Sequence, residues 1–187
     1  MFYHASNTPD IKELLPHTSN HNKPLVYLTT KRENCLVYLS NAVEKHCRDI
    51  GYRHIGKYHK WASYGFTKDG ILKLDEFWPN ATMETYAGVS GYIYSAETVP
   101  QAEKMTDIPF AAISSAPVPV EACEFIPDAY EALKKAEAQG LIILRKYEEN
   151  SEQMLDWIRR CVKDEYAQAV DSPDYRLFLA AKFSYVG

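Results

Sequence analysis

The sequence feature that most limits the fold is an alternation of apolar and polar residues on both sides of a turn. Phe66 comes before the pair Asp69-Gly70, and Leu72 follows it on the other side. Asp-Gly is a strong signal for a two-residue β-hairpin turn, and a period of two is typical of strands rather than helices. We therefore predict a β-hairpin over roughly residues 61–78.

The size and charge of the chain narrow its class. It has 187 residues, enough for one well-buried core. A net charge of −4 gives no sign of a general nucleic-acid or membrane binder. The first residues lack the basic start and apolar stretch of a signal peptide, and no run approaches the ~20 apolar residues of a spanning helix. We expect a cytoplasmic protein with no membrane partner.

Cysteine and histidine spacing gives no signal for a metal site. The four cysteines are scattered without a C-x-x-C pair. His17 and His21 have helical spacing, but they lie in a polar segment without a neighbouring cysteine or carboxylate cluster. The sequence therefore predicts reduced core thiols and no bound metal.

Short strands and helices are predicted along the rest of the chain, which makes the expected fold class α+β. A capping residue before an apolar stripe indicates a helix start, as Asp128 and Ser151 do. Strands are expected at 2–4, 25–28, 86–94, 111–120 and 141–144, helices at 31–46, 128–139 and 152–162, and helical turns at 11–15 and 102–105. The type of the apolar piece 175–183 is left open.

Four short motifs occur in a particular order along the chain. The first is Tyr3-His4-Ala5-Ser6, the second is Val26-Tyr27-Leu28-Thr29-Thr30, the third is Tyr38, and the fourth is Glu124-Phe125-Ile126. This order resembles the ADP-ribosyltransferase fold of the diphtheria-toxin and poly-ADP-ribose-polymerase type. The resemblance covers roughly residues 2–145.

The resemblance implies a fold and an activity. It implies an ADP-ribosyltransferase-like split β-sheet or sandwich with flanking helices, made of residues 1–145. Residues 146–187 would form a C-terminal helical appendage packed on the same domain. The implied activity is transfer of ADP-ribose from NAD to an unknown macromolecular or small-molecule acceptor with release of nicotinamide. An NAD glycohydrolase is the nearest enzymatic variant, because water can replace the acceptor.

The resemblance also implies residue roles. Tyr27 and Tyr38 would hold the cationic nicotinamide ring between them, since aromatic faces attract cations. His4 would position the NAD ribose that does not carry the nicotinamide. Ala5, Ser6 and Thr29 would make further contacts with NAD. The predicted cofactor-binding positions are therefore Tyr27, Tyr38, His4, Ala5, Ser6 and Thr29. NAD would bind as the substrate, and no metal is expected.

A carboxylate near the scissile ribose would stabilise the oxocarbenium-like transition state. By the resemblance this residue is Glu124, with His4 as the second catalytic candidate. Glu121 is the rival, and strand alternation sends it and Glu124 to opposite faces. We prefer Glu124 because of the aromatic residue and isoleucine that follow it.

Structural roles for these residues and other functions for the protein stay open. Tyr27 and Tyr38 are also explained as core rings with one exposed edge, and His4 as a structural hydrogen-bonding group. The family usually has glycine where this chain has Ala5, which favours a catalytically silent NAD-binding or nucleotide-binding module of the same fold as an alternative function. A third hypothesis is a nucleic-acid-binding protein that uses the basic and aromatic residues of the segment 52–68.

Overall fold

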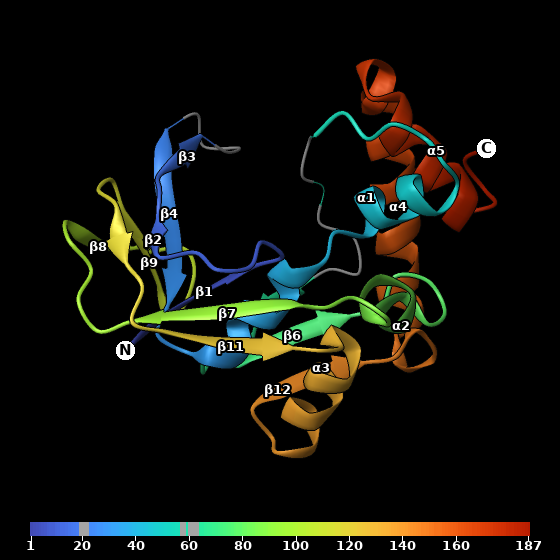
Figure 1. Cartoon of the computed structure of the whole chain (residues 1–187). Coiled ribbons are helices and arrows are strands. Elements are labelled where there is room, and N and C mark those ends of the chain that lie inside the picture. The colour runs from blue at the N-terminus through green and yellow to red at the C-terminus, as the bar shows by residue number, and fades with distance from the viewer. Residues whose placement is uncertain (19–22, 57–58, 60–63) are drawn as a thin grey trace. The chain divides into compact units, whose positions relative to one another are not determined.

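The computed structural model describes residues 1–18, 23–56, 59 and 64–187. The protein is α+β, with antiparallel β-ladders and five α-helices in the described residues. Figure 1 draws the helices as coils and the strands as arrows. No helix in that part of the chain is long and apolar enough to cross a membrane.

The largest sheet has seven strands, in the order β11-β7-β1-β4-β9-β8, with β3 paired to β4 beside this path. Its strands are β1 (Phe2–Ser6), β3 (His17–Thr18), β4 (Pro24–Thr29), β7 (Gly91–Ala96), β8 (Ala102–Lys104), β9 (Ala111–Ser114) and β11 (Ala122–Ile126). Two smaller sheets pair β10 (Val118–Pro119) with β2 (Glu13–Leu14), and β12 (Ile142–Arg145) with β6 (Leu72–Asp75) and β5 (Tyr64–Phe66).

The helices are short except for one near the C-terminus. They are α1 (Ala42–Asp49), α2 (Ala81–Tyr86), α3 (Ala129–Ala138), α4 (Glu152–Gln168) and α5 (Pro173–Lys182), with 3₁₀ segments η1 (Arg32–Leu39), η2 (Tyr147–Glu149) and η3 (Ala169–Asp171).

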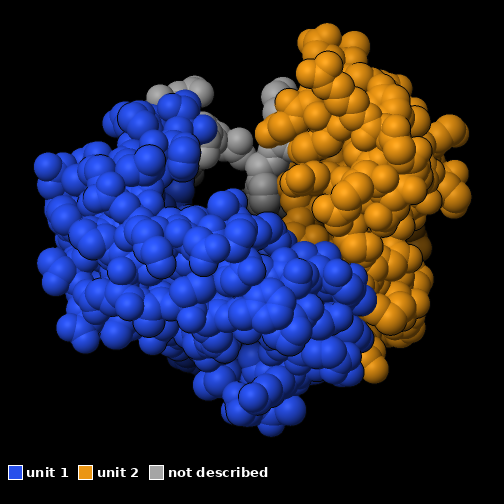
Figure 2. Space-filling model, in the orientation of Figure 1, with its two compact units in different colours: residues 1–39, 66–73, 86–143 blue, residues 40–65, 74–85, 144–187 orange. Residues whose placement is uncertain are grey.

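The chain divides into two compact units that are discontinuous in sequence (Figure 2). Unit 1 comprises residues 1–39, 66–73 and 86–143, and unit 2 comprises 40–65, 74–85 and 144–187. The predicted appendage 146–187 falls entirely within unit 2, together with α1 and nearly all of α2. Each compact unit therefore brings together segments that the sequence separates widely.

Each unit has its own apolar core. In unit 1, side chains from β4 and β7 pack with Leu14 and Val118 of the small sheet, and all are buried. In unit 2, α1 and α5 pack around buried aromatic side chains, with Phe178 at 0% exposure and Trp78 at 5%. Burial of apolar surface on this scale is the main favourable contribution to folding.

The predicted helix caps are confirmed. The carboxylate of Asp128 accepts the N–H groups of Tyr130 at 2.9 Å and Glu131 at 3.1 Å, so it caps α3. The hydroxyl of Ser151 accepts the N–H of Met154 at 3.2 Å and caps α4. These side chains satisfy backbone donors that have no partner inside the helix.

Two predicted helical turns were wrong. Residues 13–14 form β2 and residues 102–104 form β8 instead. In the first case the carbonyl of Lys12 accepts the N–H of Val120, and Leu14 pairs with Val118. Strand pairing, with the distant β10 for β2 and with the nearby β9 for β8, overrode the local helical pattern, because single-sequence propensity is a weak preference.

Two other boundaries also differ from the predictions. The predicted strand 86–94 is β7 from Gly91 onward, because α2 ends at Tyr86 and Gly88 has a φ of 72°. The predicted helix 31–46 is divided into η1 and α1, and Asn41 caps the second piece by accepting the N–H groups of Val43 and Glu44. Capping and turn residues inside each segment end the regular structure there.

The Asp69-Gly70 turn gives a first prediction. Gly70 has a φ of 76°, and a Cβ there would lie 2.7 Å from Cε2 of Phe110. Gly70→Ala should therefore lower the free energy of unfolding by about 2 kcal/mol, from left-handed backbone strain and this clash together. Chemical denaturation measures the loss. Gly140→Ala is the control, because Gly140 has a φ of 71° but nothing within 4 Å of an added Cβ. Equal losses in the two variants would contradict a role for Phe110.

Candidate functional site

The predicted NAD site lies where β1 meets β4 in unit 1, a place we call the β1–β4 junction. Within these two described strands, the ladder contains the single pair Tyr3–Thr29, whereas β1 and β7 share five pairs. Figure 1 shows β4 running in a different direction from β1. The large sheet is thus continuous on the β7 side of β1 and nearly split on the β4 side.

His4 connects the two strands at this junction. Its Nδ1 lies 2.8 Å from the carbonyl oxygen of Tyr27. A carbonyl only accepts hydrogen bonds, so Nδ1 carries the proton and donates it. Burial lowers the pKa of His4, although the bond to Tyr27 acts in the opposite direction. The ring is therefore neutral at neutral pH, with Nε2 as an acceptor.

The two tyrosines lie on elements next to this junction. Tyr27 is half-buried on β4, and Tyr38 is 45% exposed on η1. Ala5 is half-buried on β1. The structure thus places Tyr27 and His4 on strands that meet, and presents the ring of Tyr38 partly to solvent.

The two predicted hydroxyl contacts serve local turns. The hydroxyl of Ser6 accepts the N–H of Thr8 at 3.1 Å. That of Thr29 accepts the N–H of Lys31 at 3.2 Å, and Thr29 is buried. Each hydroxyl keeps further hydrogen-bonding capacity beyond the bond it makes to the backbone.

Sheet register separates Glu124 from His4. Ile93 of β7 pairs with Ala5 on one side and with Glu124 on the other. His4 belongs to the next row, with Tyr94. Side chains in one row share a face and successive rows alternate. The side chains of His4 and Glu124 therefore leave this part of the sheet on opposite faces.

The carboxylate of Glu124 is held by an arginine. Oε2 accepts from Nε of Arg32 at 2.7 Å, and Oε1 accepts from Nη2 at 2.6 Å. This two-point contact is the strongest geometry for an arginine and a carboxylate, and the hydrogen bond raises the pKa of Arg32. The negative charge of Glu124 is therefore compensated from η1 in this arrangement.

Two other carboxylates of unit 1 are relevant to the choice of the catalytic residue. Glu121 precedes β11, and its Oε1 accepts the N–H of Glu97 at 3.0 Å. Glu103 of β8 is in one row with Ile113 and Tyr27, and so shares the face of Tyr27. The backbones of Glu103 and Tyr27 are two strand spacings apart, about 10 Å. The sequence pattern missed Glu103, because a helical turn at 102–105 leaves its side chain without a fixed relation to Tyr27.

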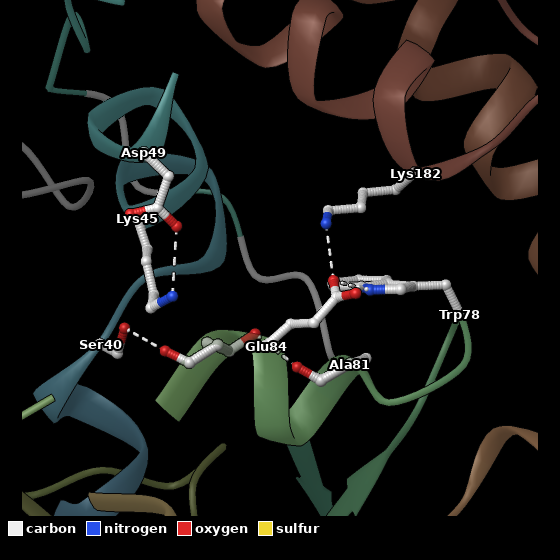
Figure 3. A network of polar contacts seen from close by, with 8 residues as sticks. Ser40, Lys45, Asp49, Trp78, Ala81, Glu84 and Lys182 are labelled. Carbon is white, nitrogen blue, oxygen red and sulfur yellow. Dashed lines mark hydrogen bonds and ion pairs between the residues drawn. The ribbon is translucent and has the colours of Figure 1, made fainter. Parts of the chain in front are cut away.

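Unit 2 contains a separate cavity of about 260 Å³ that no sequence motif indicated. Figure 3 shows its polar network, in which Glu84 accepts from Nζ of Lys182 at 2.6 Å and from Nε1 of Trp78 at 2.7 Å. Burial disfavours the charged form of Glu84, but these two hydrogen bonds keep its pKa below the usual range. Its lining residues are Ala42, Lys45, His46, Asp49, Trp78, Glu84, Thr85, Phe178 and Lys182.

The second acidic group of this cavity is also paired. Nζ of Lys45 lies 3.2 Å from Oδ2 of Asp49. Burial, with a smaller effect of Lys182, lowers the pKa of His46. Both acidic groups are thus compensated from within the cavity, which gives it the character of a structural ion-pair network.

A third feature, also in unit 2, brings together three metal-binding side-chain types. Donor atoms of Cys47, His54 and Asp174 all lie within 4.8 Å of one another. Sequence spacing did not indicate this group, because the aspartate lies 120 residues from the histidine along the chain. Of the two histidines weighed from the sequence, His17 lies exposed on β3, and His21 is outside the described residues.

The basic and aromatic segment 52–68 is described only in part. Residues 57, 58 and 60–63 lie outside the described residues, among them Lys57 and Lys60. Nδ1 of His54 lies 2.8 Å from Oδ2 of Asp174, so this histidine is engaged within unit 2. The nucleic-acid hypothesis stays a prediction.

Comparisons of the chain with protein-family models, with curated proteins and with solved structures found no match.

Proposed function

We propose that unit 1 binds NAD at the β1–β4 junction and transfers its ADP-ribose group to an acceptor, with release of nicotinamide. The observation that carries the proposal is the hydrogen bond of His4 to the carbonyl of Tyr27, where β1 and β4 share one pair. It fixes the imidazole of one predicted contact residue against the backbone of the other. The order of motifs that resembles ADP-ribosyltransferases supplies the identity of the ligand.

The chemistry of the junction suits this ligand. The neutral His4 ring has Nε2 as an acceptor, which can take a hydrogen bond from a ribose hydroxyl. The faces of Tyr27 and Tyr38 attract the cationic nicotinamide ring. Tyr38 is 45% exposed, so its ring has surface to offer to a ligand.

The identity of the catalytic carboxylate is the open part of the proposal. Glu124 is the residue that the resemblance implies, and acting on the ribose would require it to leave Arg32. Glu103 is the competing candidate. The Tyr3–Thr29 pair places both glutamates on the face of Tyr27, so the charge around each carboxylate is what distinguishes them. In the part of the chain that the structure describes, the carboxylate of Glu103 makes no hydrogen bond or ion pair. A carboxylate without a compensating cation stabilises a developing positive charge more strongly.

A catalytically silent NAD-binding module is the second candidate. The contact between Glu124 and Arg32 favours it, since a compensated carboxylate on the face opposite His4 gives little stabilisation to an oxocarbenium ion. Ala5 in place of the family's glycine points the same way. This alternative predicts NAD binding without nicotinamide release.

Titration calorimetry with NAD tests the binding step. Tyr27→Ala and Tyr38→Ala should each weaken the affinity about 10-fold, the loss expected for one ring contact with a cation. Tyr185→Ala is the control, because Tyr185 is a 40% exposed tyrosine of unit 2. Absence of NAD binding by the wild-type protein would overturn both candidate functions.

Chromatographic detection of free nicotinamide tests the chemical step. We expect wild-type protein to release nicotinamide, and the catalytic glutamate to be the one whose replacement by glutamine lowers the rate at least ~100-fold with little change in NAD affinity. Glu124→Gln, Glu103→Gln and Glu121→Gln are compared directly, with Glu137→Gln, an exposed glutamate of α3, as control. Binding without release, with water or with a panel of protein and nucleic-acid acceptors, would leave the silent module as the function.

A further inference from the structure

We infer that Cys47, His54 and Asp174 form a zinc-binding site in unit 2. The three side chains offer one sulfur, one nitrogen and one oxygen donor, all within 4.8 Å of one another. Zinc is the divalent ion that accepts this mixture of thiolate, imidazole and carboxylate. The inference does not depend on the NAD site, which lies in unit 1.

The three residues come from different parts of unit 2 and are held by its secondary structure. Cys47 lies in the last turns of α1, and Asp174 in the first turn of α5. His54 follows α1 by a few residues, and its Nδ1 lies 2.8 Å from Oδ2 of Asp174. The site is therefore assembled when α1 and α5 pack against each other.

Burial makes a bound cation favourable. Cys47 is 0% exposed and Asp174 is 1% exposed, among the apolar side chains of the unit 2 core. A carboxylate in such surroundings requires charge compensation or several hydrogen bonds. Zn²⁺ with one thiolate, one carboxylate and one neutral imidazole has no net charge, which suits this environment.

The neighbouring backbone positions the carboxylate as a ligand. Oδ2 of Asp174 accepts the N–H of Ile55 at 2.9 Å, and Oδ1 accepts the N–H of Tyr175 at 2.9 Å. Such second contacts orient metal-binding carboxylates in proteins. The thiol of Cys47 points to the same residue, with Sγ 3.9 Å from the carbonyl oxygen of Asp174.

Binding would require the three donor atoms to move to tetrahedral separations. Donor atoms of a tetrahedral zinc site lie roughly 3.3–3.8 Å apart, given zinc–ligand distances of 2.0–2.3 Å. The thiol of Cys47 gives its proton to solvent, and the His54 proton moves from Nδ1 to Nε2 so that Nδ1 coordinates. Water fills the fourth position, as in other sites with three protein ligands.

The competing explanation is a purely structural hydrogen bond from His54 to Asp174 that anchors the start of α5. It accounts for the 2.8 Å contact without any metal. The two explanations differ in what Co²⁺ does when added to metal-free protein. Cobalt bound by a thiolate gives a sulfur-to-metal charge-transfer band in the near ultraviolet, and four-coordination gives strong visible bands.

The test uses the whole chain, stripped with a chelator and titrated with Co²⁺ and then Zn²⁺. We expect one metal ion per chain, a thiolate band that zinc abolishes, and a melting temperature raised about 5–10 °C at a hundredfold excess over Kd. Cys47→Ala and His54→Gln should weaken zinc binding roughly 100-fold or more. Cys161→Ala and His46→Gln, outside the group, should leave it unchanged.

Each outcome decides the question. Absence of the thiolate band in the wild-type protein overturns the inference without recourse to any variant, so a variant that fails to fold does not matter. Zinc binding that persists in both Cys47→Ala and His54→Gln also overturns it, because the metal would then bind elsewhere. Loss in these two variants with retention in both controls establishes the site.

Discussion

Phe178→Ala is expected to lower the free energy of unfolding by about 3–5 kcal/mol, the largest stability loss that we predict for this chain. Phe178 is 0% exposed in the core of unit 2. Its ring meets Trp78 edge-on with centroids 5.6 Å apart and His46 at 5.8 Å. Truncation removes these ring contacts and leaves a cavity that a well-packed core fills only in part.

Denaturant unfolding followed by tryptophan fluorescence measures this loss, since Trp78 reports directly on the packing. Leu177→Ala is the matched control, because Leu177 is the preceding residue of α5 and is 40% exposed. Leu177→Ala should lower the free energy of unfolding by less than about 1 kcal/mol. Similar losses in the two variants would contradict the placement of α5, with Phe178 inward and Leu177 outward.

Asp174→Ala is expected to lower the free energy of unfolding of the metal-free protein by about 3 kcal/mol. The change removes the acceptor of three groups at once, namely Nδ1 of His54 and the N–H groups of Ile55 and Tyr175. Buried donors without an acceptor carry the full cost of losing water. The measurement is made in the presence of a chelator, so that no bound metal contributes to stability.

Asp171→Ala serves as the control for this variant, since Asp171 is exposed and three residues away along the chain. We expect its effect to stay within about 0.5 kcal/mol. A loss for Asp174→Ala no greater than that for Asp171→Ala would show that the carboxylate does not hold the segment after α1 against α5.

The same carboxylate should make stability depend on acid. Burial alone would raise the pKa of Asp174, but the hydrogen bonds from Ile55, Tyr175 and His54 lower it below the usual value. The folded state thus binds this proton less readily than the unfolded chain. The stabilisation is fully present above the ordinary aspartate pKa of about 3.9 and is lost as pH falls through the folded value.

Unfolding titrations between pH 6 and 2.5 compare the wild-type protein with Asp174→Asn. The wild type should lose stability more steeply below about pH 4, because the amide of the variant does not titrate. Parallel curves for the two proteins would mean that other carboxylates determine the acid sensitivity.

Local chemistry explains which elements could be predicted from the sequence. Asp128 and Ser151 cap the helices that follow them, because a side-chain oxygen reaches its own helix terminus whatever the rest of the chain does. The hairpin turn at Asp69-Gly70 is likewise local, and β5 and β6 are neighbours in the three-stranded sheet. Such signals act over a few residues and need no tertiary partner.

The elements that were predicted wrongly depend on partner strands outside their own segment. β2 pairs with β10 about a hundred residues later, and β8 is a strand because it pairs with β9. The apolar piece 175–183, whose type was left open, falls in α5 up to Lys182, where Phe178 and Leu179 pack into the unit 2 core. Periodicity over a few residues cannot report such contacts.

The candidate sites also divide into features that the sequence determines and features that the tertiary structure determines. The sequence by itself determined the residue types of the predicted NAD site, His4, Tyr27, Tyr38 and Glu124, and the strands that carry His4 and Tyr27. Only the tertiary structure decided that Glu124 leaves the sheet opposite His4 and is held by Arg32, because register is set by pairing between strands far apart in the chain.

The cluster of Cys47, His54 and Asp174 is likewise a product of tertiary structure. Nothing in the spacing of these residues relates the third to the first two. They meet because α1 and α5 bury their apolar faces in one core, which brings together side chains more than a hundred residues apart in sequence. The sequence determined the capped helices and the hairpin turn, whose interactions are local, and the packing of those helices decided which polar groups became neighbours.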